Sequence, residues 1–162
     1  MRRRTDKILI VGIGEKNMDA YVVIGDPNTR KSSVIRSLTG CFNRSRRTIL
    51  LQNGTQILIY ARVSSLQESE TTAQEFIAEA THTNCQTVIF CLWPTENQID
   101  PISYPNATAY LAEFIAAGWN IVHVAILGAT PAIYPNQASF PNSQSDPINQ
   151  TAQSIRTFFK WK

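Results

Sequence analysis

Short apolar runs alternate with amphipathic segments along most of the chain. Residues 21–24 are apolar, and beyond them Val34, Ile35 and Leu38 recur at helical spacing before Gly40. Spacings of three and four residues place side chains on one face of a helix. A glycine after the last turn favours the left-handed conformation that ends many helices. This part of the sequence therefore predicts a strand followed by a helix.

Two β-rich runs come next, at residues 48–51 and 56–61, and they are joined through Asn53 and Gly54. Asn-Gly is typical of the tight turns that connect antiparallel strands, so a hairpin is expected. The segment before it contains Arg44, Arg46 and Arg47. We interpret this segment as a hydrophilic loop that leads into the hairpin.

The second half of the chain continues the alternation. Residues 68–81 and 106–117 have helical patterns, with Gly118 ending the second, whereas residues 87–93 and 121–127 form apolar strands. Nearly continuous apolar strands are typical of parallel sheets covered on both faces. The inward positions expected on the two helices are Ala73, Phe76, Ile77, Ala80, Tyr110, Leu111, Phe114 and Ile115.

The last part of the chain, from residue 128 to 145, is rich in Pro, Asn, Gln and Ser and predicts a loop with a short strand at 138–140. Asp146 and Pro147 then form an N-cap followed by a proline at the first helical position. A final helix is expected, with Ile148, Ala152, Ile155 and Phe159 on its buried face.

The order of these elements predicts an α/β fold with a mostly parallel sheet and one antiparallel hairpin strand. The chain has 162 residues and 43% apolar content, which suits one compact domain with a substantial core. We therefore expect a single domain over residues 1–162. Within it, residues 1–19 add a strand at 7–11 and a turn.

Composition excludes several classes of function. Cys41, Cys85 and Cys91 lack C-x-x-C spacing, and the two histidines lie in separate elements, so neither a zinc site nor a disulfide framework is expected. The net charge of +3 is modest, and the basic N-terminus lacks interleaved aromatic residues, which argues against nucleic-acid binding. No apolar run approaches the roughly 20 residues of a membrane span, and no signal peptide is recognisable. A cytoplasmic protein is predicted.

The turn between the first strand and the first helix contains a phosphate-loop pattern. Such loops follow G-x-x-x-x-G-K-[ST]: backbone N–H groups cradle phosphate oxygens, lysine supplies a positive charge, and the hydroxyl binds magnesium. Gly25, Lys31 and Ser32 match this spacing, but Arg30 stands where the second glycine is required. Arg30 either distorts the cradle or points outward and adds a phosphate contact.

Residues 25–40 resemble the first motif of the Ras-like translation-factor and Era-type GTPases, G-x-P-N-x-G-K-S-[ST]-L-[IL]-x-x-L-[TS]-G. The matching residues are Gly25, Pro27, Asn28, Lys31, Ser32, Ser33, Leu38, Thr39 and Gly40. The resemblance implies a three-layer Ras-like P-loop NTPase fold over about residues 20–160, with nucleotide at the strand ends. It also implies phosphate contacts from Gly25, Asn28, Arg30, Lys31, Ser32 and Ser33, with magnesium on Ser32 when a nucleotide binds.

The remaining motifs of that family are missing. Its magnesium-binding D-x-x-G aligns with Ala61 and Ser64, and its guanine-reading N-K-x-D aligns with residues 128–131, which contain no carboxylate. Thr48 is the candidate for the switch threonine of the resembled family. Glu68 and Glu96 follow strands, but we interpret both as exposed acids displaced into loops.

These observations lead to two hypotheses. The first is a degenerate GTPase-like (pseudo-GTPase) domain that acts through a protein partner, with weak or absent nucleotide binding and no efficient hydrolysis. The alternative is an active nucleotide-binding protein that takes GTP or ATP with magnesium through Lys31 and Ser32, and whose hydrolysis a partner completes.

Overall fold

The computed structural model describes residues 17–130 and 132–162, so the strand expected at 7–11 lies outside the described residues. The elements are β2 (Asp19–Gly25), α1 (Lys31–Thr39), β3 (Arg44–Leu50), β4 (Gln56–Ser65), α2 (Ala73–Thr81), β5 (Thr87–Leu92), α3 (Ala107–Ala116), β6 (Asn120–Leu127), β7 (Gln137–Phe140) and α4 (Ile148–Phe159).

The strands form one sheet in the order β3-β4-β5-β2-β6-β7. β3 and β4 are antiparallel, and the other four neighbouring pairs are parallel. The predicted α/β class with its single antiparallel hairpin is therefore confirmed. Many doubly wound folds share this architecture, so the Ras-like assignment stays a prediction.

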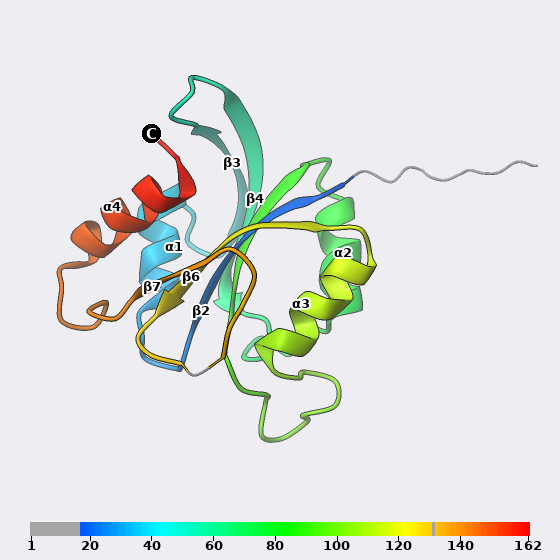
Figure 1. The fold of residues 1–162 in the computed structure, drawn as a ribbon. Coiled ribbons are helices and arrows are strands. Elements are labelled where there is room, and N and C mark those ends of the chain that lie inside the picture. Colours follow the sequence, from blue (N-terminus) through cyan, green and yellow to red (C-terminus); the bar gives the residue numbers. More distant parts are fainter. Residues whose placement is uncertain (1–16, 131) are drawn as a thin grey trace, which may run out of the picture.

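Helices cover both faces of the sheet, which gives three layers (Figure 1). The alternation of side chains along β2 explains this arrangement, because successive residues of a strand point to opposite faces. Val22 and Ile24 join the core under α2 and α3, whereas Tyr21 and Val23 join the core under α1 and α4. Both faces of β2 are apolar for this reason.

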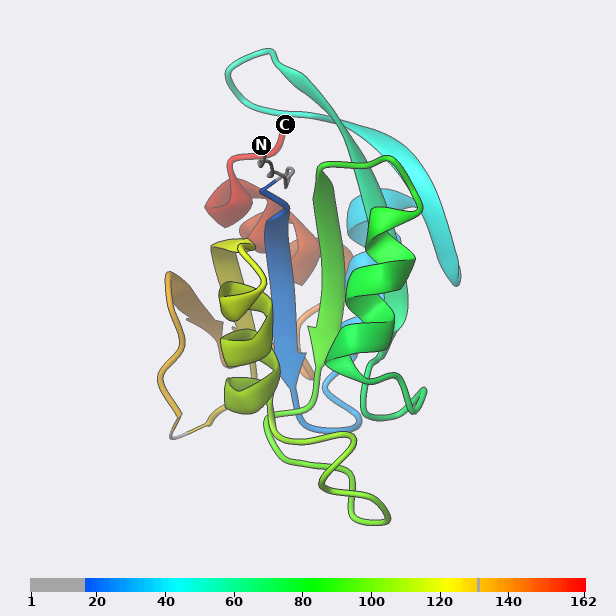
Figure 2. The same cartoon turned by 90° about the vertical axis from the view of Figure 1, so that its right-hand side faces the viewer.

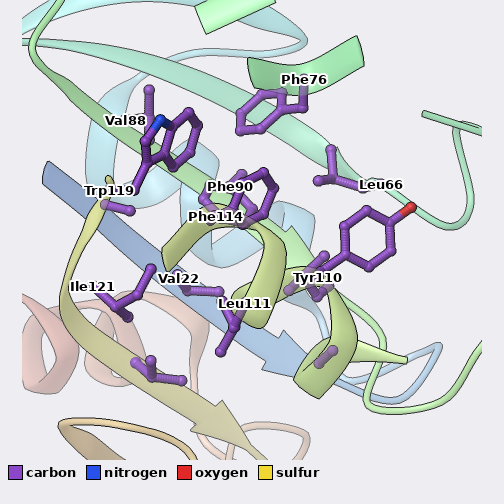
Figure 3. Close-up of a cluster of buried hydrophobic side chains, with 14 of the residues drawn as sticks. Val22, Leu66, Phe76, Val88, Phe90, Tyr110, Leu111, Phe114, Trp119 and Ile121 are labelled. Carbon is purple, nitrogen blue, oxygen red and sulfur yellow. The ribbon is translucent and has the colours of Figure 1, made fainter. Parts of the chain in front are cut away.

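The core under α2 and α3 is dominated by aromatic rings (Figure 3). Phe114 stacks on Trp119 with ring centroids 4.6 Å apart, and Phe76 lies 4.9 Å from Phe90. Such ring pairs stabilise the fold beyond what burial of the rings alone contributes. The predicted inward residues of the two helices are buried except Ile77, which is half-buried, and Ile115, which is 50% exposed.

Several predicted boundaries are wrong. Arg44, Arg46 and Arg47 belong to β3 and not to a loop, because the segment pairs along its length with β4. The α2 helix begins at Ala73 and not at residue 68, since Thr72 and Glu75 form a reciprocal capping box. At α4 the cap is Pro147, and the Asp146 side chain makes no capping hydrogen bond.

The predicted helix ends are confirmed at two glycines. Gly40 follows α1 with a φ of 78°, and Gly118 follows α3 with a φ of 93°. Within the described residues, every helix is too short or too polar to cross a bilayer.

Candidate functional site

The phosphate loop occupies residues 26–30, between the end of β2 and the start of α1. Gly25 precedes it where space is short: a Cβ there would clash with the Thr29 hydroxyl and lie 3.2 Å from the Leu127 carbonyl oxygen. Asn28 and Arg30 both adopt left-handed backbone angles, with φ of 74° and 72°. Arg30 thus has a backbone conformation that glycine adopts without strain.

Three donors of this loop converge on one backbone oxygen. The Asp26 carbonyl accepts from the Thr29 amide at 3.2 Å, the Thr29 hydroxyl at 2.7 Å and the Lys31 ammonium at 2.8 Å. The lysine side chain therefore folds back over its own loop. Its hydrogen bond to Asp26 uses one of three N–H groups, which leaves two for another partner.

Lys31 is also largely buried, with 7% of the residue exposed. Burial lowers the pKa of its ammonium group, and the carboxylates of Glu68 and Asp26 partly offset this effect. A positive charge at a helix N-terminus favours an anion in the adjoining pocket, but the two carboxylates already balance part of the charge of Lys31.

A pocket of about 250 Å³ lies beside this loop. Its lining residues lie at or just beyond the carboxyl ends of β2, β4 and β5. From these ends α1 leaves the sheet toward one face and α3 toward the other (Figure 1). Such a switch point is the usual ligand crevice of an open α/β sheet. The lining residues are Pro27, Asn28, Arg30, Lys31, Ser32, Ser33, Ser65, Glu68 and Trp93.

The structure thus brings five of the six predicted phosphate-binding residues to one pocket: Asn28, Arg30, Lys31, Ser32 and Ser33. The sixth, Gly25, is buried below the loop. Arg44, Arg46, Arg47 and Thr48 are exposed on the edge strand β3 and do not line the pocket.

Ala61 and Ser64, the residues aligned with the D-x-x-G motif, do not line the pocket. Ala61 is fully buried in the middle of β4, and the residues that reach the pocket from this segment are Ser65 and Glu68. The reason is an irregularity in β4, because Ala61 pairs with Ile89 but Ser65 pairs with Cys91. Four residues of β4 therefore span two residues of β5, a bulge that the apolar pattern did not reveal.

The oxygen donors at the pocket suit magnesium only in part. The Ser32 hydroxyl donates to the Val63 carbonyl at 3.2 Å and keeps its lone pairs, and Glu68 is the one carboxylate in the lining. Magnesium is normally held by one or two carboxylates together with phosphate oxygens and waters. No cluster of three or more His, Cys, Asp or Glu suited to a metal exists within residues 17–130 and 132–162.

Cys91 lies beneath the pocket and takes no nucleophilic role. It is fully buried, its Sγ donates to the Val63 carbonyl at 2.9 Å, and burial raises its pKa to about 12. The thiol is therefore neutral at physiological pH, and thiolate chemistry needs the ionised form. Cys41 and Cys85 are likewise buried and free.

Residues 142–146, far along the chain, form hydrogen bonds with the phosphate loop. We call this segment the latch. The Arg30 guanidinium donates to the carbonyls of Asp146 at 3.0 Å and Ser143 at 3.4 Å. In return, the Gln144 side chain donates to the Asn28 carbonyl at 2.6 Å, and the Ser143 hydroxyl donates to the Thr29 carbonyl at 3.4 Å. The sequence predicted only a loop here. The polar composition of the segment does not indicate which part of the chain it contacts.

Comparison of the sequence with protein-family models gave no match, and the comparisons with curated proteins and with solved structures gave no significant match either.

Proposed function

We propose that this protein is a degenerate GTPase-like domain that acts through protein contacts, with weak or absent nucleotide binding and no efficient hydrolysis. The observation that carries this proposal is the state of the phosphate loop. Its lysine hydrogen-bonds to Asp26, and the side chain at the missing glycine is bound to the latch. Phosphate binding has to compete with both sets of contacts.

The chemistry around the loop supports the same proposal. β2 lies between β5 and β6, and neither neighbour ends in an acidic residue. Phosphoryl transfer in phosphate-loop enzymes depends on such a residue to organise the metal. Among the described residues at the end of β6, Gly128, Ala129 and Thr130 offer no carboxylate for recognition of guanine.

One observation favours the alternative, in which GTP or ATP binds with magnesium through Lys31 and Ser32. Both residues line the pocket, and Glu68 adds a carboxylate beside them. In that case Ser32, Ser65 and Glu68 would hold the cation, and the cation would offset the charge of the phosphates. Hydrolysis would then need a residue from a partner.

A titration separates the two proposals. Fluorescent GTP and ATP analogues are added to the protein and to Lys31→Ala, with and without magnesium, and binding is followed by anisotropy. We expect dissociation constants no tighter than about millimolar, because phosphate has to compete with Asp26 for Lys31 and with residues 143 and 146 for Arg30. Micromolar binding that Lys31→Ala abolishes, or magnesium-dependent hydrolysis lost in that variant, would establish the alternative.

A further inference from the structure

A loop beside the pocket presents apolar side chains to solvent. Residues 94–106 connect β5 to α3 and project beyond the carboxyl end of the sheet (Figure 2). Ile99 is 88% exposed and Ile102 is 91% exposed. Single exposed apolar residues are ordinary on protein surfaces, but two at the tip of one loop need an explanation.

The ends of this loop are held together by a buried glutamine. Gln67 is fully buried, and its amide nitrogen donates to the carbonyls of Trp93 at 2.9 Å and Pro105 at 3.1 Å. Its side-chain oxygen accepts from the Trp93 amide at 2.9 Å. Asn97 is anchored to the same residue, because its side chain donates to the Gln67 carbonyl at 3.0 Å.

The tip of the loop is ordered by its own polar side chains. The Asn97 side-chain oxygen accepts from the amides of Ile99 at 2.8 Å and Asp100 at 3.1 Å, and Asp100 accepts from the Ser103 amide at 3.1 Å. The Tyr104 amide donates to the Asp100 carbonyl at 3.1 Å. The backbone that carries both isoleucines is therefore already fixed, which lowers the entropic cost of binding through them.

The charge around the loop is negative. Residues 94–106 contain two acids, Glu96 and Asp100, and no lysine or arginine. Burial raises the pKa of Tyr104, and the nearby carboxylates of Glu70, Asp100 and Glu75 raise it further. Glu70 and Glu75 therefore lie near Tyr104 at the base of the loop, and Asp100 lies within the loop itself.

We propose that the tip of the 94–106 loop, with the acids at its base, is the surface that binds a partner protein through a basic segment with an apolar face. Ile99 and Ile102 would be the apolar anchors, since binding energy concentrates in a few central side chains. Glu70, Glu75 and Asp100 would attract the basic residues around them and set the orientation. This inference rests on the proposed role as an interaction module and names its surface and the chemistry of its partner.

The probe is a 16-residue amphipathic helical peptide of lysine and leucine. The control is the same peptide with every lysine replaced by glutamate. The peptides are titrated into isotopically labelled protein at low salt and followed by NMR. We expect the lysine peptide to shift the amides of residues 96–104. The double variant Ile99→Ser/Ile102→Ser should weaken binding at least about tenfold.

Ile133→Ser is the matched control, because Ile133 is 86% exposed and lies outside the loop. It should leave the affinity unchanged. Equal weakening by both variants, or shifts centred away from residues 96–104, would overturn the proposal. So would a concentration-dependent dimer that the double variant abolishes, because the occupant would then be a second copy of this chain.

The outcome is independent of the nucleotide titration. Ile99 and Ile102 do not line the pocket, so the double variant should bind nucleotide analogues as the unmodified protein does. Failure of the peptide titration would remove this surface as the partner site. Tight nucleotide binding would instead remove the pseudo-GTPase proposal.

Discussion

Arg30 is held in a strained conformation at the junction of the phosphate loop and α1. Its φ of 72° and ψ of 29° lie in the left-handed region, which costs a residue with a Cβ about 1–2 kcal/mol. Two hydrogen bonds from the guanidinium to the latch compensate for this strain. Backbone strain and side-chain anchoring can be separated by mutation.

We predict that Arg30→Gly is more stable than Arg30→Ala by about 1 kcal/mol. Both variants lose the hydrogen bonds to Ser143 and Asp146, but only glycine relieves the positive φ. Urea denaturation gives the two free energies of unfolding. Ser154, which is exposed in α4, is the control position. There Ser154→Ala should be more stable than Ser154→Gly by about 1 kcal/mol, because alanine favours a helix and glycine does not. If the alanine variant were the more stable one at both positions, strain at Arg30 would be ruled out.

Lys31 and Ser32 could be placed from the sequence because motif spacing and the preceding strand fix the start of α1. The partners of Arg30 could not, because Ser143 and Asp146 offer backbone oxygens, which every residue has. Glu68 was interpreted as displaced from the site, and it reaches the pocket only through the irregularity of β4.

A largely buried ion pair joins β4 to α2. Arg62 donates to Glu79 at 2.8 Å, and the Tyr60 hydroxyl donates to the same carboxylate. Arg62 also donates to the hydroxyls of Ser69 at 3.0 Å and Thr71 at 2.8 Å. The side chain of Arg62 is 6% exposed, so its charge depends on these partners.

We predict that Glu79→Ala lowers the free energy of unfolding by about 3 kcal/mol, because it leaves a buried guanidinium without its counter-ion. Glu113→Ala on the neighbouring helix should cost at most about 0.5 kcal/mol, since Glu113 is exposed. Urea denaturation measures both. The double variant Arg62→Met/Glu79→Met should recover most of the loss, and a double variant no more stable than Glu79→Ala would contradict this account.

At the scale of elements, periodicity and turn chemistry predicted most of the described fold. The Asn53-Gly54 turn and the faces of α1 and α4 were confirmed. The predicted elements were wrong where tertiary contacts outweighed the local sequence pattern. The arginine-rich segment at 44–47 is polar like a loop, yet it forms an edge strand because pairing with β4 satisfies its backbone on one side.

Across the whole molecule, the latch links the last quarter of the chain to the first strand-helix junction. Its contacts with residues 28–30 span more than 110 positions of sequence. Local opening of such a contact exposes only the amides that it protects, whereas central strands exchange through global unfolding. Hydrogen exchange therefore reports whether the latch controls the phosphate loop.

We predict that Ser143→Ala/Gln144→Ala accelerates exchange of the Thr29 and Val34 amides by about tenfold, the equivalent of one to two side-chain hydrogen bonds. The Thr29 amide donates to Asp26 and the Val34 amide to Arg30, so both depend on the loop that the latch holds. Amides of β5 should keep their rates, and Gln150→Ala, exposed in α4, should change neither set. Equal acceleration in β5 would mean that the latch contributes only to global stability, and the loop would then open without regard to residues 142–146.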